Sequence, residues 1–307
     1  MPPRPPSPEV ASAGAPRVLD VRSLRDWPLP ALADDADKEA RGRIVVVAGS
    51  REIPGAAVLA ATAALRAGAG KLVIATAQSV AAHMAFTMPE ARVIALPETA
   101  TGAFDLAGVT LLADALRSAD AVLLGPGMMD EAATCRFVAA LLPALKDSSV
   151  VLDALAMNVL EPGGRFERPV LLTPHAGEMA HLTGETKEAI QADPLGTAQS
   201  AARRWNAVVA LKGPTTVLAT PDGRAWQHEG GNCGLATSGS GDTLAGCIAG
   251  LAARGASLEQ ACAWGVVAHA QAGEALAHRI GAVGYLAREL PAEMLAFING
   301  VLPATVP

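Results

Sequence analysis

A glycine-rich turn beside an acidic residue is the strongest chemical signal in this sequence. The turn has the sequence SGSGD over residues 238–242 and continues into a small, apolar stretch that favours a helix. The first N–H groups of a helix lack partners within it and lie at the positive end of its dipole, so they can bind phosphate. Asp242 would stand beside that anion and could accept a proton. The turn therefore predicts phosphoryl-transfer chemistry, with a plain helix start as the alternative.

Other candidate residues follow short apolar runs that are typical of strands. Ligands of open α/β sheets bind at the carboxyl ends of the strands, so residues directly after a strand are candidates for a site. Each of these segments alone is more often structural than functional, but together with the turn at 238–242 they predict one site at one edge of a sheet. The segments are 49–57, 125–128, Asp153 with Asn158, 173–178 and 212–216.

The elements that must position these segments alternate between strands and helices. The strands are apolar throughout, which suits a sheet that is covered on both faces. We expect an α/β fold with a doubly wound, mostly parallel central sheet, helices on both faces, and a hairpin at 215–229. Strands are expected at 44–48, 71–75, 121–124, 150–153, 170–173 and 207–211, and helices at 56–67, 131–142, near 177–182 and twice between 239 and 277.

The chain divides at about residue 42. Residues 1–41 are rich in proline and are expected to be a disordered or surface-wrapped lead-in. Residues 42–307 show no linker, repeat or second core, so we expect a single domain. Its core must be aliphatic, because 51% of the 307 residues are hydrophobic but only 3% are aromatic.

Composition and missing motifs exclude several classes of protein. A net charge of −6 and few aromatic residues argue against nucleic-acid binding. The proline-rich start and the lack of a long apolar run predict a cytoplasmic protein without membrane contact. The four cysteines lack metal-site spacing, and neither a P-loop nor a Rossmann fingerprint is present. The turn at 238–242 is therefore the candidate phosphate site.

Taken together, these segments resemble one known family, the ADP/ATP-dependent NAD(P)H-hydrate dehydratases of the ribokinase-like superfamily. The resemblance extends from about Gly42 to the C-terminus. It implies a ribokinase-like fold and a metabolite-repair lyase that dehydrates 6S-hydrated NADH or NADPH. ADP or ATP with Mg²⁺ would drive this reaction through phosphorylation of the C6 hydroxyl and elimination. The matching motifs are GSREIPGAAVLAATAALRAGAG (49–70), GPGM (125–128), TPHAGE (173–178), LKGPTT (211–216) and NCGLATSGSGDTLAG (232–246).

The resemblance also implies roles for individual positions. Ala56, Gly127 and His175 would line the hydrated dinucleotide, and Asp242 would face the departing hydroxyl as the catalytic base. It further implies a homotetramer and a separate epimerase that acts on the same metabolite. The residues that would hold the adenine nucleotide are Lys212, Gly213, Pro214, Thr215, Thr216, Ser240 and Gly241.

Two positions depart from the family pattern. Leu155 replaces a second carboxylate after Asp153, which leaves the metal ligands unknown, and Ser238 replaces a glycine. Two alternatives remain open at this point. One is a ribokinase-like small-molecule kinase that acts on a vitamin precursor such as hydroxyethylthiazole, and the other is a non-catalytic nucleotide sensor.

Overall fold

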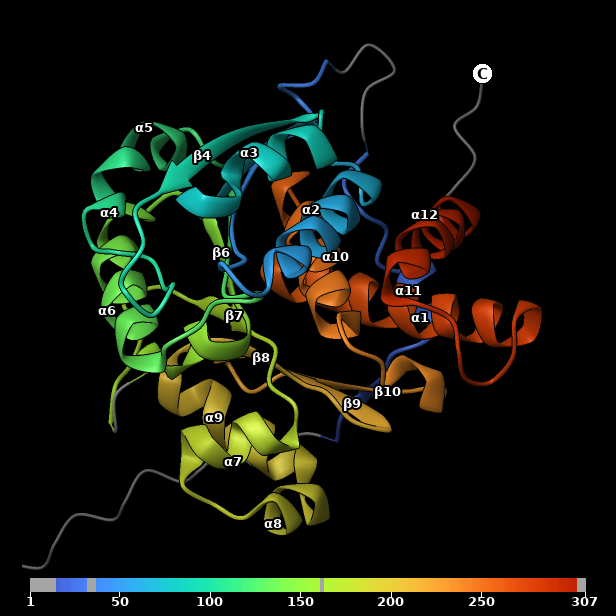
Figure 1. Ribbon diagram of the computed structural model, residues 1–307. Coiled ribbons are helices and arrows are strands. Elements are labelled where there is room, and N and C mark those ends of the chain that lie inside the picture. Colours follow the sequence, from blue (N-terminus) through green and yellow to red (C-terminus); the bar gives the residue numbers. More distant parts are fainter. Residues whose placement is uncertain (1–14, 32–36, 161–162, 303–307) are drawn as a thin grey trace, which may run out of the picture.

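The computed structural model describes residues 15–31, 37–160 and 163–302. Within these residues, one ten-stranded sheet forms the centre of the molecule, and helices cover both of its faces (Figure 1). The strands are β1 (Arg17–Val18), β2 (Arg43–Val47), β3 (Lys71–Ala77), β4 (Ala91–Leu96), β5 (Ala121–Leu124), β6 (Ser149–Leu152), β7 (Val170–Leu172), β8 (Ala207–Leu211), β9 (Thr215–Ala219) and β10 (Ala225–Glu229).

The sheet is parallel over most of its width. The strand order is β1-β10-β9-β8-β7-β6-β5-β2-β3-β4, and all neighbours from β8 to β4 pair in parallel. β9 runs antiparallel to both β8 and β10, which confirms the hairpin expected at 215–229. The expected α/β architecture with a mostly parallel, doubly wound sheet is therefore confirmed.

The sheet divides the hydrophobic core into two clusters. In β2, Ile44 and Val46 pack into one cluster, while Val45 and Val47 pack into the other. Successive side chains of a strand point to opposite faces, so a strand buried on both faces must be apolar at every position. This is why the strands show no polar alternation in the sequence.

Each cluster is closed by its own set of helices. The first is covered by α1 (Val21–Arg25), α2 (Pro54–Arg66), α3 (Gln78–Thr87), α10 (Ser240–Ala253), α11 (Leu258–Arg279) and α12 (Leu290–Val301). The second is covered by α4 (Gly108–Leu111), α5 (Ala113–Arg117), α6 (Glu131–Leu141), α7 (Ala176–Thr183), α8 (Lys187–Ala192) and α9 (Pro194–Trp205). Short 3₁₀ helices complete the described chain, η1 (Leu142–Ala144), η2 (Ala154–Val159), η3 (Cys233–Leu235) and η4 (Ala287–Glu289).

Helices α2 and α10 pack backbone against backbone (Figure 1). A Cβ atom on Gly246 would lie 2.1 Å from the carbonyl oxygen of Ala60, and one on Gly250 would lie 2.4 Å from that of Ala64. Only glycine permits so close an approach. The contact fixes the start of α10, which carries the glycine-rich turn, relative to α2.

The N-terminal segment, residues 15–31, packs on the far edge of the sheet and on α11. β1 pairs with β10, Leu24 is fully buried, and the Trp27 ring stacks on Trp226 with 5.6 Å between centroids. The Trp264 indole N–H donates to the Trp27 carbonyl at 2.9 Å. The disordered or surface-wrapped lead-in expected over residues 1–41 is therefore wrong for residues 15–31, which are folded into the core because Leu19, Leu24 and Leu29 are buried there. Residues 1–14 and 32–36 lie outside the described residues, so for them the expectation stays a prediction.

Among the helices of the described residues, none combines the length and the apolar character that a bilayer crossing requires.

Candidate active site

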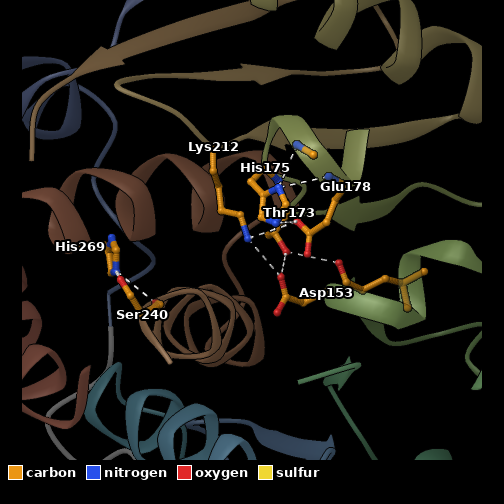
Figure 2. Close-up of polar contacts among 9 residues, drawn as sticks. Asp153, Thr173, His175, Glu178, Lys212, Ser240 and His269 are labelled. Atoms are coloured by element: carbon orange, nitrogen blue, oxygen red, sulfur yellow. Dashed lines mark hydrogen bonds and ion pairs between the residues drawn. The ribbon is translucent and has the colours of Figure 1, made fainter. Parts of the chain in front are cut away.

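Polar side chains gather where β6, β7 and β8 end, in a group that we call the polar cluster (Figure 2). The Thr173 hydroxyl donates to Asp153 Oδ1 at 2.6 Å. The Lys212 ammonium lies 3.5 Å from the same Asp153 oxygen and 3.8 Å from Glu178 Oε2. Asp153 is only 3% exposed, so its charge is balanced inside the protein by Lys212. The polar cluster comprises Asp153, Thr173, His175, Glu178 and Lys212.

His175 and Glu178 start helix α7 by capping each other. His175 Nδ1 accepts hydrogen bonds from the N–H groups of Gly177 (3.0 Å) and Glu178 (3.1 Å). The Glu178 carboxylate accepts from the His175 N–H at 2.8 Å. This reciprocal cap explains the H-x-x-E spacing of the TPHAGE segment. It also leaves the His175 side chain 58% exposed at the rim of the polar cluster.

Helix α10 begins without a side-chain cap. Gly239 precedes it with φ +87°, and the Ser240 N–H donates to the Thr237 carbonyl at 3.2 Å. This bond occupies one of the N–H groups at the start of the helix, which the sequence predicts as a phosphate site. The N–H groups of Gly241 and Asp242 have no acceptor among the described residues, and they remain available to a ligand.

The start of α10 lies against the polar cluster. A Cβ atom on Gly241 would lie 3.4 Å from Lys212 Nζ, so the lysine charge lies next to the helix turn that carries the free amides. Together they can bind a phosphate, because an anion gains from both the ammonium group and the positive end of the helix.

Among the carboxylates of this site, Asp242 has a strongly shifted pKa. Burial raises its pKa to about 6, and the negative charges of Asp153 and Glu178 act in the same direction. The positive charge of Lys212 opposes them. A carboxylate with a pKa near 6 is ionised at neutral pH but holds a proton far better than an ordinary aspartate, which suits a general base.

The loops that follow β2 and β5 meet next to the polar cluster. A Cβ atom on Gly127, whose φ is +66°, would lie 2.6 Å from the Ala56 methyl group. The adjoining Gly125 packs directly on the Asp153 backbone, where a Cβ would lie 1.8 Å from the carbonyl oxygen. The structure therefore brings Ala56 and Gly127 together, and Gly125 connects them to Asp153.

The predicted nucleotide residues fall into two groups. Gly213 and Pro214 are exposed in the turn between β8 and β9, directly after Lys212, and Thr215 and Thr216 begin β9. Ser240 differs, since its hydroxyl lies 2.9 Å from His269 Nε2, and Figure 2 shows this pair apart from the polar cluster. No sequence motif singles out His269, which is one of two histidines in the alanine-rich helix α11.

No group of three or more metal-binding side chains occurs in residues 15–31, 37–160 and 163–302. Mg²⁺ that arrives with a nucleotide needs only one or two carboxylates, because phosphates and water complete its shell. Asp153 and Asp242 provide two carboxylates, and Asp153 is close enough for its charge to raise the pKa of Asp242. Leu155, in η2, adds no ligand. The donor set therefore fits Mg²⁺ bound together with a nucleotide.

Two cavities lie away from the polar cluster. Cavities of about 800 and 480 Å³ open elsewhere, beside Ser149 at the start of β6 and beside Lys71 at the start of β3. The polar cluster lies at the opposite ends of the strands, so it is identified by its chemistry.

Comparisons with known proteins agree with this arrangement. The family described as NAD(P)H-hydrate dehydratase matches residues 44–295. An ADP-dependent (S)-NAD(P)H-hydrate dehydratase of Xanthomonas campestris pv. campestris is 49% identical over 92% of this chain and 96% of its own. The crystal structure of the ADP/ATP-dependent NAD(P)H-hydrate dehydratase of Bacillus subtilis, co-crystallised with ATP/Mg²⁺, superimposes with a TM-score of 0.81 at 32% identity, covering 94% of this chain and 99% of that one.

A longer relative is also similar. The bifunctional NAD(P)H-hydrate repair enzyme Nnr of Moorella thermoacetica is 41% identical over 85% of this chain, but the match spans only 50% of that protein.

Proposed function

Because this chain belongs to the NAD(P)H-hydrate dehydratase family, we propose that it converts hydrated NADH or NADPH back to NAD(P)H, with ADP or ATP and Mg²⁺. The enzyme is a hydro-lyase with a ribokinase-like fold. One observation carries the assignment of its site, namely a carboxylate of raised pKa, Asp242, in a helix turn whose amides are open and lie beside Lys212.

The two substrates occupy neighbouring parts of the site. Ala56, Gly127 and His175 line the hydrated dinucleotide, consistent with the contact between Ala56 and Gly127. Asp242 lies between the two substrates and faces the C6 hydroxyl. The adenine nucleotide is held by Lys212, Gly213, Pro214, Thr215, Thr216, Ser240 and Gly241. Of these, Lys212 and the Gly241 amide bind its phosphates.

The reaction begins at the C6 hydroxyl, because hydroxide is a poor leaving group. Asp242 accepts the hydroxyl proton while the oxygen attacks the terminal phosphoryl group of the nucleotide. The Lys212 ammonium and the N–H groups of Gly241 and Asp242 offset the charge that develops on the phosphoryl oxygens. The ring-nitrogen lone pair then expels phosphate from C6, and loss of a proton from C5 restores the dihydronicotinamide.

Asp153 and Asp242 are the residues that would hold Mg²⁺. The ion offsets phosphate charge when bound. Thr173 and Lys212 both contact Asp153 Oδ1, so the Asp153 carboxylate is already oriented.

Replacing Asp242 with asparagine tests this assignment. Asp242→Asn keeps the size of the side chain but removes the base, so we expect a roughly 10²- to 10⁴-fold fall in turnover. Nucleotide binding should remain measurable, because Lys212 and the Gly241 amide are unchanged. The assay follows recovery of dihydronicotinamide absorbance from hydrated NADH, with ADP and ATP side by side.

The same assay separates the alternative functions. Turnover of Asp242→Asn at the wild-type rate would exclude Asp242 as the base. A wild-type protein that instead phosphorylates a hydroxyethylthiazole would be a kinase, and one that is stabilised by nucleotide without any turnover would be a sensor.

Assembly, domain boundary, partner and location are proposed from the same resemblance. We propose a homotetramer of a single dehydratase domain over residues 42–307, which light scattering would detect as four copies of the 31.1 kDa chain. A separate epimerase would act on the same metabolite. The cytoplasm is the proposed location.

A further inference from the structure

His269 connects helix α11 to the first turn of α10 (Figure 2). Its Nε2 lies 2.9 Å from the Ser240 hydroxyl and 3.2 Å from the Ser240 carbonyl oxygen. A carbonyl oxygen can only accept a hydrogen bond, so the second contact places a hydrogen on Nε2. One imidazole nitrogen therefore contacts both the side chain and the backbone of the first residue of α10.

The surroundings keep this imidazole neutral. Burial lowers the pKa of His269 to about 4. The hydrogen bond to Ser240 acts against this shift and raises the pKa, while the positive charge of Lys212 lowers it further. His269 itself is half-buried, between the buried Ala268 and Ala270. His269 thus acts at neutral pH as an uncharged hydrogen-bond donor, and it adds no cation to the phosphate site.

The contact replaces what a helix cap normally does. Side-chain caps bind the second or third amide of a helix and stabilise it, as Asp130 does for α6 and Ser257 for α11. In α10 those amides belong to Gly241 and Asp242, and a cap would compete with a phosphate for them. His269 instead fixes Ser240, so both amides stay open.

We propose that His269 is a positioning residue for nucleotide binding, which holds the first turn of α10 so that the Gly241 and Asp242 amides point at a phosphate. The proposal rests on the proposed function, since it assumes that ADP or ATP binds at this turn. His269 acts through Ser240 and does not touch the nucleotide.

Three variants test the proposal. His269→Ala removes the contact, His269→Gln restores a donor near the position of Nε2, and His278→Ala removes an exposed histidine from the same helix as a control. We expect His269→Ala to raise the KM for ADP about 3- to 10-fold, the effect of one lost hydrogen bond. The KM for hydrated NADH should change less than twofold. His269→Gln should recover most of the loss, and His278→Ala should behave as wild type.

A thermal-shift measurement with Mg²⁺ and ADP gives a second readout that needs no turnover. The shift should be smaller for His269→Ala than for wild type. In a double-mutant cycle with Ser240→Ala, the two substitutions should be less than additive, because both remove the contact with the Ser240 hydroxyl, while Ser240→Ala alone keeps the bond to the Ser240 carbonyl oxygen. If His269→Ala does not fold, the contact can still be tested with His269→Gln and with a double-mutant cycle that combines His269→Gln and Ser240→Ala.

The outcomes distinguish this proposal from the proposed function. An unchanged KM and shift in His269→Ala, strict additivity with Ser240→Ala, or an equal loss in His278→Ala would overturn the role of His269. A wild-type protein that binds ADP without dehydrating hydrated NADH would overturn the proposed function, while the thermal shifts would still decide on His269. Absence of any ADP-induced shift in wild type would overturn both.

Discussion

At the scale of single residues, the site depends on the balance between three carboxylates and one ammonium group that lie close together. Asp153, Glu178 and Asp242 bring three carboxylates around the one ammonium group of Lys212. Lys212 contacts two of these carboxylates directly, and the third keeps a raised pKa. Asp242 is therefore the carboxylate that most readily accepts a proton.

The pH dependence of the reaction follows from this charge balance. A general base works only when ionised, so kcat/KM should fall about tenfold per pH unit below the pKa of about 6 of Asp242 and level off above pH 7. Initial rates between pH 5 and 8 would test this. Glu178→Gln removes a negative charge that raises this pKa, so its acidic limb should move to lower pH. An acidic limb that stays in place would show that another group controls it.

Part of this chemistry could be predicted from the sequence. Asp242, Lys212 and His175 stand in motifs whose order indicates a phosphoryl-transfer site. The raised pKa of Asp242 could not be predicted, because it arises from burial and from carboxylates that other strands bring near. The bond between the Ser240 amide and Thr237 was also missed, because it depends on the local backbone of one turn.

At the scale of elements, the close contact of α2 with α10 sets the position of the glycine-rich turn. Gly246 and Gly250 face the backbone of α2, with Ala60 and Ala64 opposite them. A wider spacing would move the turn away from Ala56, because Ala56 lies in the first turn of α2.

Gly246→Ala tests this packing. Its Cβ would meet the Ala60 carbonyl oxygen, so we expect a loss of about 1–3 kcal/mol in the free energy of unfolding. Gly300→Ala in α12 is the matched control, because its Cβ meets nothing within 4 Å. The control should gain up to about 1 kcal/mol, since alanine favours helix over glycine. Denaturant unfolding measures both, and the same sign for both would contradict the packing argument.

Most buried elements could be predicted, and several peripheral ones could not. The strands at 121–124 and 207–211 have the predicted bounds, because uninterrupted β-branched and leucine residues mark them clearly. Strand β4 was missed because it lies at the edge of the sheet, where its residues alternate irregularly between exposed and partly buried positions. Several helices were missed too, among them α3, α9 and α12, each of which buries only part of its residues against the sheet.

At the scale of the whole molecule, the N-terminal segment is part of the folded core. Leu24 is fully buried in the cluster that α11 and α12 close. Gln260 of α11 donates to the carbonyl oxygens of Trp27 and Pro28. Among the described residues, no hydrogen bond or ion pair joins the segment to the polar cluster, so we expect the segment to affect stability and not the reaction.

Leu24→Ala separates stability from catalysis. A fully buried leucine replaced by alanine costs about 2–5 kcal/mol, which should lower the melting temperature by several degrees. The kcat of the folded enzyme should stay at the wild-type value. Leu106→Ala, at a side chain that is 49% exposed, is the control and should leave both unchanged. A loss of kcat without a loss of stability in Leu24→Ala would contradict this division.

The attachment of the N-terminal segment also constrains the order in which the chain can fold during synthesis. His228 bonds the carbonyl of Leu19 across 209 positions of sequence. β1 can pair only with β10, so the segment has no partner until most of the chain has left the ribosome. Contacts of such long range form late, because the loop between their ends must close first. The segment therefore emerges from the ribosome before the rest of the described chain and is among the last parts to reach its native position.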